Sequence, residues 1–124
     1  MTMARALALV PDLLFGSRLQ GALQAAGHEL ELIGEEGALR LRLADRGLPS
    51  ANVLIVDLTD PELDGAAILE ALLADGELAG TATLGFYSHV EPAVRERAER
   101  AGFDLVVPRS RMAREAAQLV SRLA

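Results

Sequence analysis

The chain has 124 residues, 51% of them apolar, a formal net charge of −6 and no cysteine. This is enough apolar material for one compact domain over residues 1–124, while disulfide and thiolate chemistry are excluded and two isolated histidines make no metal cluster. Acids and arginines are interspersed without a basic stripe, and no apolar run approaches the roughly 20 residues that cross a bilayer, so we expect a cytoplasmic protein that binds neither nucleic acid nor membranes.

Five short segments have the composition of β-strands. The runs at 6–10 and 53–56 are rich in branched apolar residues, as is typical of strands buried on both faces of a parallel sheet. The segments at 82–87 and 103–107 are similar but weaker. The segment at 28–33 alternates polar and apolar residues, which predicts a half-exposed edge strand.

Segments with helical spacing separate these strands. Three of them end at glycine, a common stop signal, at Gly27, Gly76 and Gly102. The segment at 35–45 predicts a weaker helix, and the last helix is expected over residues 110–124. Its apolar side is predicted to hold Ala113, Ala116, Ala117, Val120 and Leu123.

Alternating strands and helices predict a doubly wound, three-layer α/β domain with five parallel strands, because each crossover between parallel strands is right-handed. In such sheets ligands gather at the carboxyl ends of the strands. The polar residues in those loops are Asp12, Asp57, Ser88, His89 and Arg109.

Asp57 directly follows four apolar residues, where a carboxylate requires solvent, a cation or several donors. Three residues later, Asp60 followed by Pro61 predicts the start of the third helix. Ser88 is either part of a capping box with Glu91 or has a free hydroxyl group.

Asp57, Ser88 and Arg109 place a carboxylate acceptor, a hydroxyl donor and a guanidinium at neighbouring strand ends. This combination favours a pocket that binds or transfers an anion. The first turn, "VPDLLFGSRL", lacks both the glycine fingerprint of dinucleotide sites and a P-loop lysine, and no G-x-S-x-G elbow indicates a hydrolase. A small α/β enzyme or ligand-binding module using Asp57, Ser88, His89 and Arg109 remains an alternative, which requires a cavity of several hundred cubic ångströms.

Two sequence stretches resemble the receiver domain of two-component response regulators. Residues 57–65, "DLTDPELDG", match the family's Asp-Leu-x-Met-Pro-x-x-Asp-Gly at five of six specified positions, with Asp60 in place of methionine. Residues 98–110, "AERAGFDLVVPRS", are similar to Ala-x-x-Ala-Gly-Ala-Asp-x-Tyr-Leu-x-Lys-Pro, which aligns Arg109 with the lysine. The resemblance covers essentially the whole chain and implies a flavodoxin-like sheet with strand order 2-1-3-4-5.

The resemblance implies a role for each candidate residue. Asp57 takes the position of the phosphoacceptor, and Ser88 and Arg109 become candidates for contacting the phosphoryl group. Asp57, the carbonyl group of Thr59 and Asp12 become the candidate ligands of a magnesium ion.

Three positions depart from the family pattern. Receivers carry two adjacent acids after the first strand, but here the second acid aligns with Pro11 instead of Asp12. Arg109 replaces the lysine, and Val106 replaces the aromatic residue of the fifth strand. Together these changes predict an atypical, or pseudo-receiver, domain that requires no cofactor and binds magnesium weakly at most.

We therefore expect a signalling module that is not an enzyme and acts by protein-protein contact, with a histidine kinase, a downstream effector or a second copy as partner. A working single-domain response regulator, phosphorylated on Asp57 by a histidine kinase, is the alternative. In the family, the face of the fourth helix, fifth strand and fifth helix often carries dimerisation. On this face we expect Arg95, Arg97, Arg100, Arg111 and Arg114 to mediate contact, or to form only a solvated face with intrahelical ion pairs. Whether the chain is a whole protein or one domain of a longer one is left open.

Overall fold

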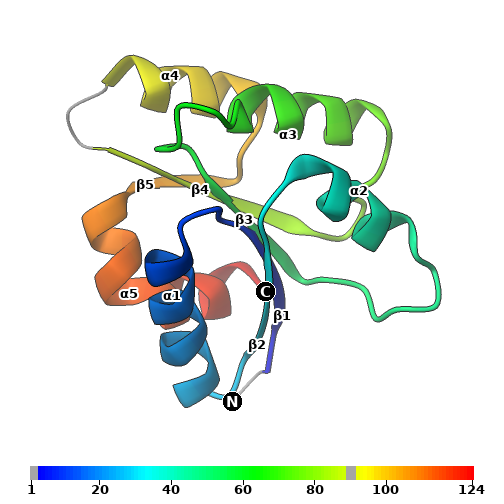
Figure 1. The fold of residues 1–124 in the computed structure, drawn as a ribbon, viewed down its shortest axis with the longest axis vertical. Helices are drawn as coiled ribbons and strands as arrows, with labels where there is room; N and C mark the ends of the chain where they lie inside the picture. The colour runs from blue at the N-terminus through cyan, green and yellow to red at the C-terminus, as the bar shows by residue number, and fades with distance from the viewer. Residues whose placement is uncertain (1–2, 89–91) are drawn as a thin grey trace.

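The computed structural model describes residues 3–88 and 92–124. It contains one five-stranded parallel sheet with helices on both faces (Figure 1). The strand order is β2-β1-β3-β4-β5. This confirms the doubly wound α/β fold and the strand order that the sequence predicts.

Strands and helices alternate along the described part of the chain. The strands are β1 (Arg5–Leu9), β2 (Glu29–Ile33), β3 (Val53–Asp57), β4 (Ala82–Tyr87) and β5 (Leu105–Pro108). The helices are α1 (Leu13–Ala25), α2 (Glu36–Ala44), α3 (Gly65–Ala74), α4 (Pro92–Ala101) and α5 (Arg109–Leu123). No helix of the described ranges is long and apolar enough to span a membrane.

Two apolar cores lie on opposite faces of the sheet. Helices α1 and α5 cover one face, and α2, α3 and α4 cover the other (Figure 1). Phe15 and Met112 belong to the first core, and Leu39 and Leu69 to the second. Strand β3 is buried on both faces over its whole length, as its apolar run predicts.

The outer strands are only half-buried. Leu30 and Ile33 of β2 are buried, whereas Glu29 and Glu31 are exposed, which confirms the predicted edge strand. On the opposite edge, Leu105 and Val106 of β5 are only partly buried. Apolar surface is therefore accessible along β5.

The prediction for the apolar side of α5 is wrong in part. Met112, Ala116, Leu119 and Val120 are buried, whereas Ala113 is exposed. Burying the longer Met112 side chain removes more apolar area from water than burying an alanine would.

The predicted start of α3 is also wrong. Asp60 and Pro61 lead into a separate turn, in which the Glu62 N–H donates to Asp60 Oδ1 at 2.8 Å. Asp64 is the N-cap instead, because its Oδ1 accepts from the Ala67 N–H at 3.1 Å. Asx turns and N-caps both use aspartate, so an aspartate before Pro61 did not by itself distinguish a turn from a helix start.

Candidate functional site

The carboxyl ends of four neighbouring strands bring the predicted site residues to one edge of the sheet. The strand register pairs Asp57 with Phe86 of β4, and Tyr87 of β4 with Pro108 of β5. Ser88 and Arg109 each directly follow one of these strands. Asp12 follows β1, the other neighbour of β3.

Asp57 is almost completely buried, with 1% of its surface exposed. Its Oδ1 accepts two hydrogen bonds from Thr59, one from the backbone N–H at 2.7 Å and one from the hydroxyl group at 2.6 Å. These donors satisfy the requirement that the sequence predicts for a buried carboxylate. Sequence reasoning assigned Thr59 only a carbonyl role and missed its hydroxyl group.

Asp12 is held by two groups on different helices. Its Oδ1 accepts from the Phe15 N–H at 3.1 Å and caps α1, while its Oδ2 accepts from Arg109 Nη2 at 3.2 Å. The hydrogen bond from Phe15 and the contact with the Arg109 guanidinium both lower the pKa of Asp12. Asp12 is therefore a helix cap and a counter-ion in this arrangement.

Arg109 contacts α1 instead of Asp57. Its guanidinium carbon lies 4.2 Å from the centre of the Phe15 ring, close enough for a cation–π contact. In residues 3–88 and 92–124, no ion pair joins Arg109 to Asp57. The structure thus brings Arg109 and Asp12 together, and holds the guanidinium apart from the carboxylate of Asp57.

The candidate ligands of a magnesium ion already have other partners in this structure. Magnesium requires near-octahedral oxygen coordination, but both oxygens of Asp12 and one oxygen of Asp57 already accept hydrogen bonds. The guanidinium beside Asp12 would also repel a cation. No group of three or more acidic or histidine side chains suited to a metal occurs in the part of the chain that is described.

Ser88 is half-buried at the same edge. Its alternative role in a capping box with Glu91 lies outside the described residues, as does the candidate His89.

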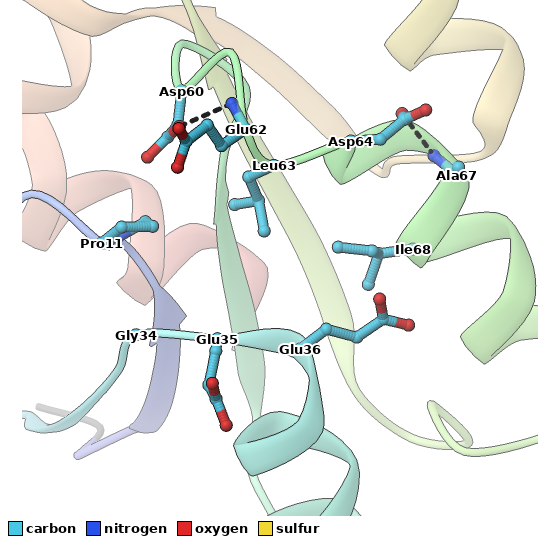
Figure 2. Close-up of a pocket in the computed structure, with 10 residues that line it drawn as sticks. All are labelled: Pro11, Gly34, Glu35, Glu36, Asp60, Glu62, Leu63, Asp64, Ala67 and Ile68. Carbon is cyan, nitrogen blue, oxygen red and sulfur yellow. Dashed lines mark hydrogen bonds between the residues drawn. The ribbon is translucent and has the colours of Figure 1, made fainter.

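Two open clefts flank the loop between β3 and α3. The larger, of about 530 Å³, lies between this loop and the start of α2, with Leu63 and Ile68 pointing toward its middle (Figure 2). The second, of about 440 Å³, lies between the same loop and α4. Asp57, Ser88 and Arg109 line neither cleft. The residues proposed for the alternative of a small enzyme or ligand-binding module therefore do not lie together in either of these clefts.

Sequence reasoning missed the acidic lining of the larger cleft. The acidic residues that could have indicated it stand in the loops after β2 and β3, and these loops become neighbours only in the folded chain. The cleft is lined by Glu35, Glu36, Asp60, Glu62 and Asp64, with Pro11, Gly34, Leu63, Ala67 and Ile68.

Most arginines of the predicted interaction face form ion pairs within the chain. Arg95 pairs with Glu99 at 2.8 Å, and Arg111 and Arg114 both approach Glu115, at 3.4 and 3.7 Å.

The remaining two arginines of that set differ from each other. Arg97 donates from Nη1 to Glu70 of α3 at 3.0 Å and so faces α3, away from the predicted face. Arg100 is exposed and has no ion pair within the described ranges, although Glu96 lies four residues before it on α4.

No family model matches the sequence, and no curated protein matches it. Solved structures of receiver domains do match in fold. Chemotaxis response regulator CheY4 of Vibrio cholerae is similar with a TM-score of 0.78, at 20% identity over 99% of this chain and 100% of that chain. A CheY-like receiver domain from Methylobacillus flagellatus gives 0.79, at 13% identity over 99% and 100%. The Mn²⁺-bound form of response regulator Rcp1 gives 0.74, at 19% identity over 96% and 90%. The fold of the chain is therefore the receiver fold.

Proposed function

We propose that the chain is a receiver-like signalling domain, not an enzyme, that acts by protein-protein contact with little or no phosphoryl transfer. The observation that carries this proposal is the pairing of Asp12 with Arg109 at 3.2 Å. This ion pair joins Asp12, the only acid of the first loop, to Arg109, the residue that aligns with the family's lysine. Within residues 3–88 and 92–124, this contact leaves Asp57 without an unpaired acid of the first loop for a metal ion and without a paired cation for a phosphoryl group.

A phosphodonor assay tests this proposal. In phosphorylation by acetyl phosphate, the Asp57 carboxylate would attack phosphorus, the bond to the acetate oxygen would break, and acetate would leave. We expect intact-mass spectrometry after incubation with acetyl phosphate and Mg²⁺ to show no adduct.

The same assay can establish the alternative, a working single-domain response regulator phosphorylated by a histidine kinase. A phosphoryl adduct on the unmodified chain that is absent from Asp57→Ala would overturn our proposal. The Rcp1 structure contains Mn²⁺. The assay is therefore repeated with Mn²⁺, so that the absence of an adduct with Mg²⁺ is not due to the choice of metal. An adduct of equal yield in Asp57→Ala marks labelling of another residue and leaves Asp57 without a reaction.

The face of α4, β5 and α5 is the surface that we assign to the partner, a histidine kinase, a downstream effector or a second copy. Phe103, Leu105 and Val106 line a cleft of about 340 Å³ along the outer edge of β5, together with Arg95 and Glu99. Apolar surface rimmed by charged residues is typical of protein-protein contacts. Arg100 adds an exposed cation on α4.

Self-association through this face has a direct test. We expect sedimentation velocity to show a dimer whose fraction rises with concentration, and Val106→Glu to abolish it by placing a charge on the apolar strip. Arg18→Glu, at an exposed position of α1, is the matched control and should dimerise normally. A monomer at all concentrations excludes the second copy as partner.

A further inference from the structure

The first turn of α1 and the first residue of α5 are joined by a contact that involves three side chains. The Asp12 carboxylate accepts from Arg109 at 3.2 Å, and the Phe15 ring lies against the same guanidinium at 4.2 Å. Asp12 and Phe15 are themselves joined by the capping hydrogen bond of α1. The guanidinium is thus held by a carboxylate and by a ring face, both from one helical turn.

The ring that supports Arg109 has a fixed position. Phe15 is 3% exposed, and its centre lies 5.0 Å from that of Phe86 in β4. Phe86 is the strand partner of Asp57. Arg109 therefore lies close to the carboxyl edge where Asp57 ends β3, yet its hydrogen bond is directed to α1.

We propose that Asp12 is a positioning residue that holds Arg109 away from any oxyanion at Asp57. An oxyanion such as phosphate has to compete with the carboxylate of Asp12 for the guanidinium. This inference deepens the proposed function, on which it rests for the role of Asp57, since it adds a small competing contact to the causes of weak phosphoryl chemistry. Asp12 is then an internal competitor of the phosphoryl group, opposite in effect to a metal ligand.

The exposure of the contact sets the size of the effect. The two side chains are 41% and 42% exposed, and ion pairs of such exposure are weak. Removing the charge of Asp12 should therefore raise the availability of Arg109 by about two- to fivefold.

Asp12→Asn isolates the charge from the cap. Asparagine caps helices as well as aspartate does, so α1 should keep its start while the ion pair is lost. Arg109 is labelled with phenylglyoxal, which reacts with accessible guanidinium groups, and the rate is followed by peptide mapping. We expect labelling about two- to fivefold faster in Asp12→Asn than in the unmodified chain, and Asp12→Ser, another good cap without charge, should agree.

Two controls separate this effect from a general change in the protein. Arg122, exposed near the end of α5, should react at the same rate in all variants. Asp64→Asn removes one charge from the N-cap of α3 and should leave the labelling of Arg109 unchanged. Equal labelling of Arg109 in the unmodified chain and in Asp12→Asn would overturn the proposal.

Inorganic phosphate tests the competition itself. We expect it to slow the labelling of Arg109 in Asp12→Asn more than in the unmodified chain. If phosphate slows the labelling of Arg109 equally in the two proteins, or does not slow it in Asp12→Asn, then Asp12 does not compete with oxyanions for Arg109. The contact would then have only a structural role. The proposed function is judged separately, by the acetyl phosphate adduct on the unmodified chain, so the two can fail independently.

Discussion

The hydrogen bond from the Thr59 hydroxyl group to Asp57 has a buried carboxylate as its acceptor. Thr59→Val keeps the shape of the side chain and the backbone N–H but removes the hydroxyl donor at 2.6 Å from Oδ1. Hydrogen bonds to charged groups contribute about 1.5–3 kcal/mol. We expect the free energy of unfolding, measured with urea, to fall by about that amount.

Thr81→Val is the matched control for this measurement. Its hydroxyl group donates to a neutral acceptor, the Ala51 carbonyl, at 3.0 Å, so the loss should be only about 0.5–1.5 kcal/mol. In an Asp57→Asn background, where Asp57 has lost its charge, the cost of Thr59→Val should approach that of Thr81→Val. Equal losses for the two valine variants in the unmodified background would argue against a charge-assisted bond.

At the scale of residues, the sequence predicts where a side chain lies in the fold better than it predicts which side chain it contacts. The place of Asp57 and its need for donors follow from the apolar run that precedes it. The partner of Arg109 does not follow, because Asp12 is 97 residues away in sequence and several acids near the strand ends were equally plausible. Side-chain pairing depends on the angles at which loops leave the sheet, which local patterns do not determine.

At the scale of elements, Leu58 fills the space left by glycines of β4 and α3. A Cβ atom at Gly85 would lie 2.8 Å from Leu58 Cδ1 and 3.3 Å from the Phe103 ring, and one at Gly65 would lie 2.8 Å from Leu58 Cδ2. Overpacking of this kind costs about 1–3 kcal/mol. We therefore expect Gly85→Ala to lower the free energy of unfolding by that amount in urea titrations.

The cause of the Gly85→Ala effect can be separated from the change of residue type. Leu58→Ala removes the clashing methyl groups, so the double variant should lose less stability than the sum of the two single variants. Gly21→Ala in the interior of α1 meets nothing within 4 Å and should stabilise by about 0.5–1 kcal/mol. Additive losses for Leu58 and Gly85 would refute the packing argument.

The order and type of the elements could be predicted because strand and helix periods differ along the chain. The ends of elements were less certain where two signals compete. Asp60 and Asp64 both suit a helix start, and the turn at Pro61 decides for the later one. On α5, Met112 and Ala113 both suit the core, and the larger side chain is buried.

At the scale of the whole molecule, ion pairs join neighbouring helices on each side of the sheet. Arg97 and Glu70 connect α4 to α3, and Arg109 and Asp12 connect α5 to α1. The hydrogen bond from Arg97 lowers the pKa of Glu70, and the contacts with Phe15 and Arg109 lower the pKa of Asp12. Both carboxylates therefore release their protons more readily in the folded chain than in the unfolded chain.

This difference predicts how stability depends on pH. A carboxylate whose pKa is lower in the folded state stabilises the fold fully above its unfolded pKa, about 4, and loses that contribution as the pH falls through the folded pKa. We expect the melting temperature to be nearly constant from about pH 7 to pH 5 and to fall below about pH 4. Acidification also takes the net charge from −6 through zero near pH 4.8 to positive values. Repulsion between like charges therefore changes with pH as well, so the pairs must be tested by substitution. Glu70→Gln should reduce the acid-induced fall in melting temperature. Glu62→Gln, at an exposed position with no ion pair in the described chain, should leave that fall unchanged. An equal fall of melting temperature with pH in the two variants would show that the α3 to α4 pair contributes nothing to acid sensitivity.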